Sequence, residues 1–126
     1  MRNALLSLLL LSLAITSLAG EADVLSAEVE HVGGDLYRFK VTVQHTDEDW
    51  DHFAKAWEVL SPDGKKLGAR ILLHPHINEQ PFTRSMTVII PKQINKVIIR
   101  AYDLIHEFGG KEFTIDIKKD KQDDIN

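Results

Sequence analysis

The stretch LYRFKVTVQH, residues 36–45, decides the fold, because apolar and polar side chains alternate along it. One face carries the apolar residues and ends in a histidine: Tyr37, Phe39, Val41, Val43 and His45. The other face is polar: Arg38, Lys40, Thr42 and Gln44. Since successive side chains of a strand point to opposite sides, this pattern predicts a β-strand with one face in a core.

Similar runs lie on both sides of this stretch and are separated by turn residues. Strands are expected at residues 24–32, 36–45, 54–60, 66–73, 82–90, 96–104 and 112–117. Gly33-Gly34 and Ser61-Pro62-Asp63-Gly64 have the composition of tight turns. About seven short strands in roughly 100 residues, without a helical pattern, are typical of an immunoglobulin-like antiparallel β-sandwich.

The N-terminus predicts export. A positively charged start precedes an uncharged apolar run from Ala4 to Ile15, which is typical of a signal peptide. Small residues permit cleavage after Ala19 or after Ala22, so we expect residues 1–22 to be a signal peptide. The run is shorter than the roughly 20 residues of a transmembrane helix, so no stable membrane insertion is expected after cleavage. The protein should be periplasmic or secreted.

Composition limits the possible functions. The 126 residues contain no cysteine, which excludes disulfides, thiolate ligands and a lipid-bearing cysteine. Core packing alone must therefore hold residues 23–117 together as one domain. A net charge of −4 without a basic run argues against nucleic acid as a partner. Residues 118–126 are nearly all charged or polar, which predicts a disordered tail.

The histidines are the feature that points to chemistry. Alternate connections of an antiparallel sandwich lie at the same end, so the loops 46–53, 74–81 and 105–111 should meet. Five of the six histidines lie in or beside these loops: His45, His52, His74, His76 and His106. Asp51 and Asp103 could add oxygen ligands or orient a ring. This arrangement predicts a metal-binding rim, with His31 at the opposite end.

His74-Pro75-His76 is the sharpest local element of this rim. Proline restricts the residue before it to extended geometry, and residues two apart in an extended segment point to the same side. Two neutral imidazoles presented together are typical of zinc and copper(II) sites, and further ligands could come from the other rim histidines. The alternative is a structural role for most of these side chains.

The available donor atoms narrow the choice of metal. Blue-copper sites need cysteine and copper(I) carriers favour methionine sulfur, so Cu(II) or Zn on nitrogen ligands remains. Asp47, Asp49 and Asp51 alternate as they do in a calcium loop, but His52 stands where such a loop needs glycine. Calcium is therefore not favoured.

The same loops could instead hold a partner without a metal. Side chains suited to an acidic or sugar-like ligand are Trp50, Glu79, Gln80, Arg84 and Tyr102. In the structural interpretation, Arg84 pairs with Glu79 or Asp103, and Phe82 plugs the end of the sandwich. The nucleophile elbow, the zinc-binding helix motif and the phosphate-binding glycine loop are all missing, so the sequence does not support an enzyme.

Several segments resemble a family of small exported bacterial proteins. They are Trp50-Asp51-His52, Trp57-Glu58-Val59, Pro62-Asp63-Gly64 and an LHPHxxEQPFTRS-type motif at residues 73–85. The resemblance extends over nearly the whole chain after the expected signal peptide. It implies a secreted β-sandwich and no particular activity.

Two functions therefore remain open. The first is an exported protein that binds Cu(II) or Zn through the histidine rim. The second is an accessory domain that binds an envelope protein or a small ligand through the same loops.

Overall fold

The structure is a computed structural model that describes residues 20–117. The tail predicted at residues 118–126 and most of the predicted signal peptide lie outside this range. Within it, no helix is long and apolar enough to cross a membrane.

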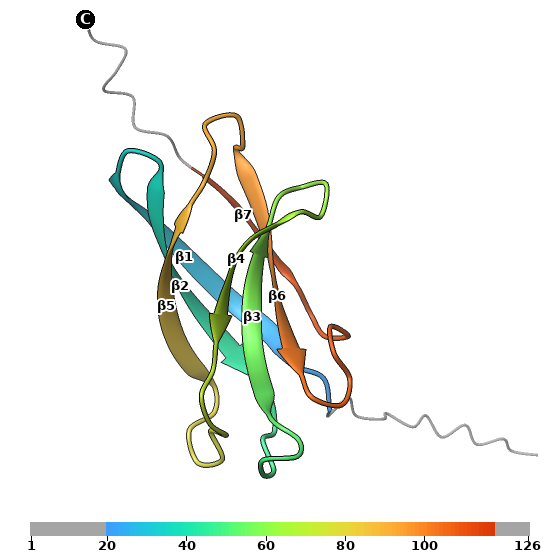
Figure 1. Cartoon of the computed structure of the whole chain (residues 1–126). Helices are drawn as coiled ribbons and strands as arrows, with labels where there is room; N and C mark the ends of the chain where they lie inside the picture. Colours follow the sequence, from blue (N-terminus) through green and yellow to red (C-terminus); the bar gives the residue numbers. More distant parts are fainter. Residues whose placement is uncertain (1–19, 118–126) are drawn as a thin grey trace, which may run out of the picture.

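The described chain folds into two antiparallel sheets that face each other (Figure 1). The first sheet has the order β1-β2-β5, with bounds Asp23–Gly33, Leu36–Gln44 and Phe82–Ile89. The second has the order β4-β3-β6-β7, with bounds Lys66–Ile71, Ala54–Leu60, Lys96–Asp103 and Phe113–Asp116. The all-β sandwich predicted from the alternation is confirmed, while its immunoglobulin-like character stays a prediction.

The core lies between the two sheets. All five inward positions of the stretch at residues 36–45 are buried, as their alternation predicts. From the other sheet they are faced by Trp57, Val59, Val97 and Ile99, each 0% exposed. Burial of one such large apolar side chain contributes about 1.5–3 kcal/mol, so packing can hold this cysteine-free domain together.

The connections separate into two ends of the sandwich (Figure 1). One end has the tight turns, where Gly34 and Gly64 have φ values of 52° and 90° that glycine adopts without strain. At the other end lie the loops at residues 45–53, 72–81 and 104–112. Gly20 also lies at this end, because its carbonyl oxygen contacts His45 and His52. We call this second end the loop end. It gathers all the predicted rim histidines, whereas His31 lies in β1 and contacts the carbonyl oxygen of Gly34.

Candidate metal centre

Two of the rim histidines form a buried group with one aspartate. His45, His52 and Asp103 each offer a ligand atom, and these atoms lie within 4.8 Å of one another. His45 follows β2, His52 precedes β3, and Asp103 ends β6. The pairing of Asp103 with Ala54 at the start of β3 brings β6 beside the loop that carries His52. The two sheets thus meet at a group that could hold a metal ion, which we call the metal centre.

The facing atoms of the metal centre are close together. His45 Nε2 is 3.2 Å from His52 Nε2 and 3.9 Å from Asp103 Oδ2. His52 Nε2 is 3.4 Å from Asp103 Oδ1. The two imidazole rings meet edge to face, with centroids 4.7 Å apart. The Nε2 atoms of His45 and His52 and the carboxylate of Asp103 therefore converge on one point.

The other nitrogen of each ring faces a carboxylate. His45 Nδ1 is 2.5 Å from Asp47 Oδ1, and His52 Nδ1 is 3.0 Å from Glu48 Oε1. Because an ionised carboxylate can only accept hydrogen bonds, each Nδ1 must carry the proton and donate it. In the neutral ring Nε2 then carries a lone pair. Carboxylates hold metal-binding histidines in this orientation in many proteins.

Acceptor atoms consequently gather in the metal centre. Asp103 Oδ1 accepts the main-chain N–H groups of Ile105 and His106 and the ring N–H of His106. Asp103 Oδ2 is buried and has no hydrogen-bond partner within residues 20–117. The carbonyl oxygen of Gly20 lies 3.0 Å from His45 Nε2. Buried acceptors need a donor or a cation, so either an additional proton or a metal ion would satisfy this group.

A proton is one way to satisfy these acceptors. Burial by itself would lower the pKa of His52, but its hydrogen bonds to Glu48 and to the Gly20 carbonyl, together with the charge of Asp103, raise the pKa above 6.5. A protonated His52 would donate from Nε2 to the neighbouring acceptors. A metal ion would have to displace that proton.

Asp47 holds the metal centre to the next loop. Its carboxylate accepts the main-chain N–H of His76 at 2.6 Å and that of Ala54 at 3.1 Å, besides the ring of His45. Burial would raise the pKa of Asp47, but the hydrogen bonds from these residues hold it below 3.8. In the sequence, Asp47 stands out only as part of the alternating aspartates of a calcium-like loop. The spacing His45-x-Asp47 in an extended segment was the signal that could have identified it.

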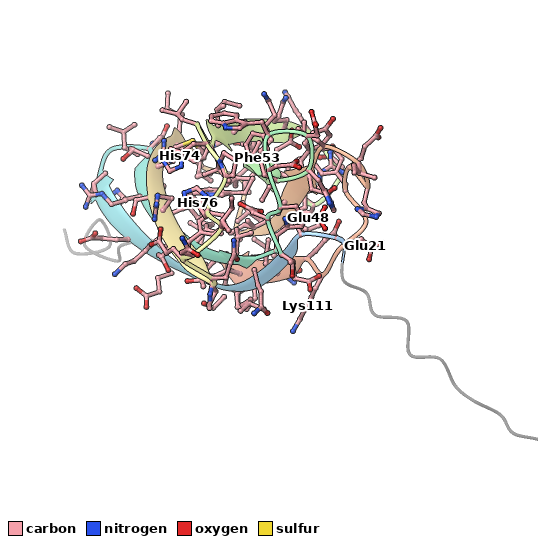
Figure 2. The ribbon with its side chains drawn as sticks, turned by 90° about the horizontal axis from the view of Figure 1, so that it is seen from below. Glu21, Glu48, Phe53, His74, His76 and Lys111 are labelled. Carbon is pink, nitrogen blue, oxygen red and sulfur yellow. The ribbon has the colours of Figure 1, made fainter. Side chains whose placement is uncertain are left out.

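The His74-Pro75-His76 pair lies outside the metal centre. The two rings are neighbours, with centroids 4.6 Å apart, as the extended geometry before proline predicts. His76 is buried and stacks on Phe82, and this burial lowers its pKa below 6.5. In the view of the loop end, His74 and His76 lie across from Glu48 (Figure 2). The His74-Pro75-His76 motif therefore packs beside the metal centre, and neither of its histidines belongs to the group of three potential ligands.

The remaining predicted ligands have different positions. His106 lies next to the centre, with its ring centroid 5.2 Å from that of His52 and its Nδ1 3.1 Å from Asp103 Oδ1. Asp51 is exposed at the tip of its loop. Glu58, which a calcium loop would need as a ligand, lies in β3 and pairs with Arg100. Glu58 therefore does not lie beside Asp51 in a common loop.

Most of the predicted ligand-binding side chains make contacts within the chain. Arg84 pairs with Glu79 at 3.2 Å and lowers the pKa of that carboxyl, as in the structural interpretation. Gln80 accepts the N–H of His45 and donates to the carbonyl of His76. Tyr102 contacts Phe108. Trp50 differs, since it is 65% exposed.

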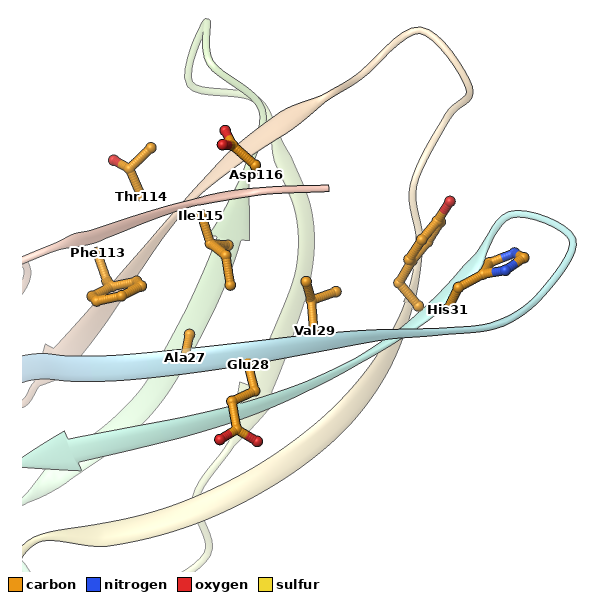
Figure 3. Close-up of a pocket in the computed structure, with 9 residues that line it drawn as sticks. Ala27, Glu28, Val29, His31, Phe113, Thr114, Ile115 and Asp116 are labelled. Atoms are coloured by element: carbon orange, nitrogen blue, oxygen red, sulfur yellow. The ribbon is translucent and has the colours of Figure 1, made fainter. Parts of the chain in front are cut away.

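A hollow of about 620 Å³ lies along β1 and β7, away from the loop end (Figure 3). Ala27, Val29, Phe113 and Ile115 project into the space between these strands and pack against the core, whereas Glu28 and Asp116 point away from it. Ligand sites usually combine an apolar wall with a few converging polar groups. This hollow is better described as the gap between β1 and β7, which are the edge strands of the two sheets.

The chain has sequence similarity to a curated protein with a lipoprotein name. The chain is similar to a protein of Halomicrobium mukohataei named "Putative lipoprotein", with 38% identity over 96 residues. The match covers 76% of this chain and 47% of that protein, so the chain spans about half the length of the curated relative it matches. No family model and no solved structure matches the chain.

Proposed function

We propose that this chain is an exported protein that binds a divalent transition metal ion, Cu(II) or Zn, through His45, His52 and Asp103. The observation that carries the proposal is the buried convergence of their ligand atoms, including an Asp103 oxygen without a hydrogen-bond partner in the described chain. Both imidazoles donate from Nδ1 to carboxylates and so direct Nε2 lone pairs to one point. A cation is the species that such a group attracts.

The donor atoms favour Cu(II) over Zn in direct competition. Two imidazole nitrogens and one carboxylate suit both metals, and for a given nitrogen and oxygen site Cu(II) binds more tightly in the Irving–Williams order. Because the sequence has no cysteine, a thiolate-based copper or zinc site is excluded. His106 would support the site by donating to Asp103 and fixing the orientation of its carboxylate.

Export is supported from two directions. The apolar run at residues 4–15 is typical of a signal peptide. The similar protein of Halomicrobium mukohataei carries a lipoprotein name, which suggests an exported and membrane-associated relative. The present chain has no cysteine to carry a lipid, so we propose a periplasmic or secreted location.

Metal titration of the untagged protein tests this function. Calorimetric titration with Cu(II) and with Zn should show one site per chain. His52→Ala should weaken binding at least tenfold, because it removes one nitrogen ligand while the buried His45–Asp47 pair stays intact. His74→Ala is the matched control: it removes an exposed imidazole of the same end and should leave the affinity unchanged. Equal losses in both variants would contradict the assignment of the site.

A second candidate function, docking of an envelope protein, is favoured by apolar side chains at the loop end. Those that are more than half exposed are Trp50, Leu73, Ile77 and Ile105. A photo-crosslinking amino acid in place of Trp50 should form a specific adduct in the cell envelope. The same substitution at Ile89, an equally exposed apolar residue at the opposite end, is the control. Identical adducts from both positions would rule against docking through the loop end.

A further inference from the structure

The chain segment that precedes β1 is fastened across the loop end. Ala22 is 1% exposed and belongs to the core, and the carboxylate of Asp23 accepts the N–H of Lys111 at 2.7 Å. The N–H of Val24 donates to the carbonyl of Lys111 at 2.8 Å. Gly110 lies so close that a Cβ there would be 2.0 Å from the carbonyl oxygen of Ala22. These contacts hold residues 22–24 against the β6–β7 connection.

Gly20 is the point at which this segment meets the metal centre. Its carbonyl oxygen is 3.0 Å from His45 Nε2 and 3.4 Å from His52 Nε2. A Cβ on Gly20 would lie 2.6 Å from Cε1 and 2.8 Å from Nε2 of His106. Three imidazole rings therefore lie around the main chain of Gly20, and a side chain at this position would have to displace the ring of His106.

We propose that the carbonyl oxygen of Gly20 is a fourth ligand of the metal ion held by His45, His52 and Asp103. When both rings are neutral and carry their protons on Nδ1, the carbonyl faces two nitrogen lone pairs, and three acceptors at these distances repel one another. A divalent cation between them turns the same geometry into attraction. A peptide carbonyl oxygen is a suitable ligand for a divalent ion beside imidazole and carboxylate. This inference rests on the proposed function.

The two cleavage positions predicted from the sequence differ in whether they keep this fourth ligand. Cleavage after Ala19 leaves Gly20 in place as the first residue and keeps the fourth ligand. Cleavage after Ala22 removes Gly20 and also takes a buried alanine from the core. The form that begins at Gly20, or any longer form, should therefore be the one that binds metal tightly.

Carbon hyperfine coupling at Cu(II) tests the assignment directly. The full chain is expressed in an exporting host with glycine labelled with ¹³C at the carbonyl, loaded with Cu(II), and its N-terminus is determined by mass spectrometry. We expect couplings to two imidazole nitrogens and a strong coupling to one carbonyl carbon. Gly20→Ala should lose the carbon coupling, because that position is no longer labelled. It should also weaken Cu(II) binding roughly 10–100-fold through displacement of His106.

Gly34→Asn is the matched control, because Gly34 lies in a turn at the opposite end, with a φ of 52° that asparagine accepts and open space around its Cβ position. This variant should retain the carbon coupling and the affinity of the unmodified chain. Nitrogen couplings without any carbon coupling would overturn this inference alone, as would tight copper binding by a chain that begins at Asp23. A chain that binds no Cu(II) would overturn the proposed function as well. Circular dichroism of each variant confirms that the fold is retained.

Discussion

His45 Nδ1 lies 2.5 Å from Asp47 Oδ1, and this contact determines which ring nitrogen of His45 faces the metal centre. The carboxylate is buried and also accepts main-chain N–H groups from the loop at His76 and from the start of β3. A single side chain therefore orients the proposed metal ligand His45 and connects two loops. Because one residue has both roles, its substitution should affect metal affinity and stability at the same time.

Asp47→Asn should destabilise the metal-free protein by about 1–3 kcal/mol, because the amide places an N–H donor against a main-chain or ring N–H donor in a buried site. Metal affinity should fall roughly 10–100-fold, as it does when the partner of a ligating histidine is lost. Urea unfolding with chelator and calorimetric titration measure the two effects. Asp49→Asn, at an exposed carboxyl two residues away, should change stability by no more than about 0.5 kcal/mol. Comparable effects at both positions would contradict the role of Asp47.

Protonation of His76 should destabilise the fold at mildly acidic pH. Burial, together with the nearby charges of Arg84 and His74, lowers the pKa of His76 below 6.5 in the folded protein. The unfolded chain therefore binds a proton at higher pH than the folded protein does, and the stability present above pH 6.5 is lost as the pH falls toward the folded pKa. In chelator, His76→Phe should gain stability relative to the unmodified protein between pH 7.5 and pH 5. A stability difference that is independent of pH would refute this.

Metal should stabilise the fold through Asp103. At a free metal concentration of 100 times Kd, binding adds about 2.7 kcal/mol to the free energy of unfolding, which raises the melting temperature by several degrees. Asp103→Asn keeps the oxygen that accepts the N–H groups of Ile105 and His106 but removes the charge. The variant should therefore fold and show little of this rise, whereas His31→Ala should show all of it. A full rise in Asp103→Asn would place the metal elsewhere.

The adjacent glycines of the β6–β7 connection should respond differently to alanine. A Cβ at Gly110 would lie 2.0 Å from the carbonyl oxygen of Ala22, so Gly110→Ala must move main chain and should destabilise by about 1–3 kcal/mol. A Cβ at Gly109 would meet the flexible end of Glu21, so Gly109→Ala should cost less. Hydrogen exchange at Val24 should accelerate in the first variant only. Equal acceleration in both would mean that the contact at Ala22 does not fasten the segment.

The alternation at residues 36–45 and the turn residues were enough to predict the sandwich. In a protein without cysteine, burial of one face of each strand determines the register between neighbouring strands. The alternation of apolar and polar residues shows directly which face that is. The gathering of the histidines at one end also follows from strand order alone. Strand ends differ from the prediction by at most two residues.

The composition of the metal centre was less accessible to sequence reasoning. His74 and His76 were the clearest motif, yet ring stacking on Phe82 and the hydrogen bond from the His76 main chain to Asp47 place them beside the centre. Those contacts depend on how the loops pack. The proposed role of Gly20 could not be predicted either, since the group involved is a main-chain carbonyl and the residue pattern reports only side chains.

Crystallography with anomalous scattering from bound Cu(II) or Zn tests the central claim most directly. The proposal predicts one anomalous peak, about 2.0–2.2 Å from the Nε2 atoms of His45 and His52 and in contact with the carboxylate of Asp103. A peak bound instead by His74 and His76, or protein crystals that exclude both metals at saturating concentration, would contradict the account.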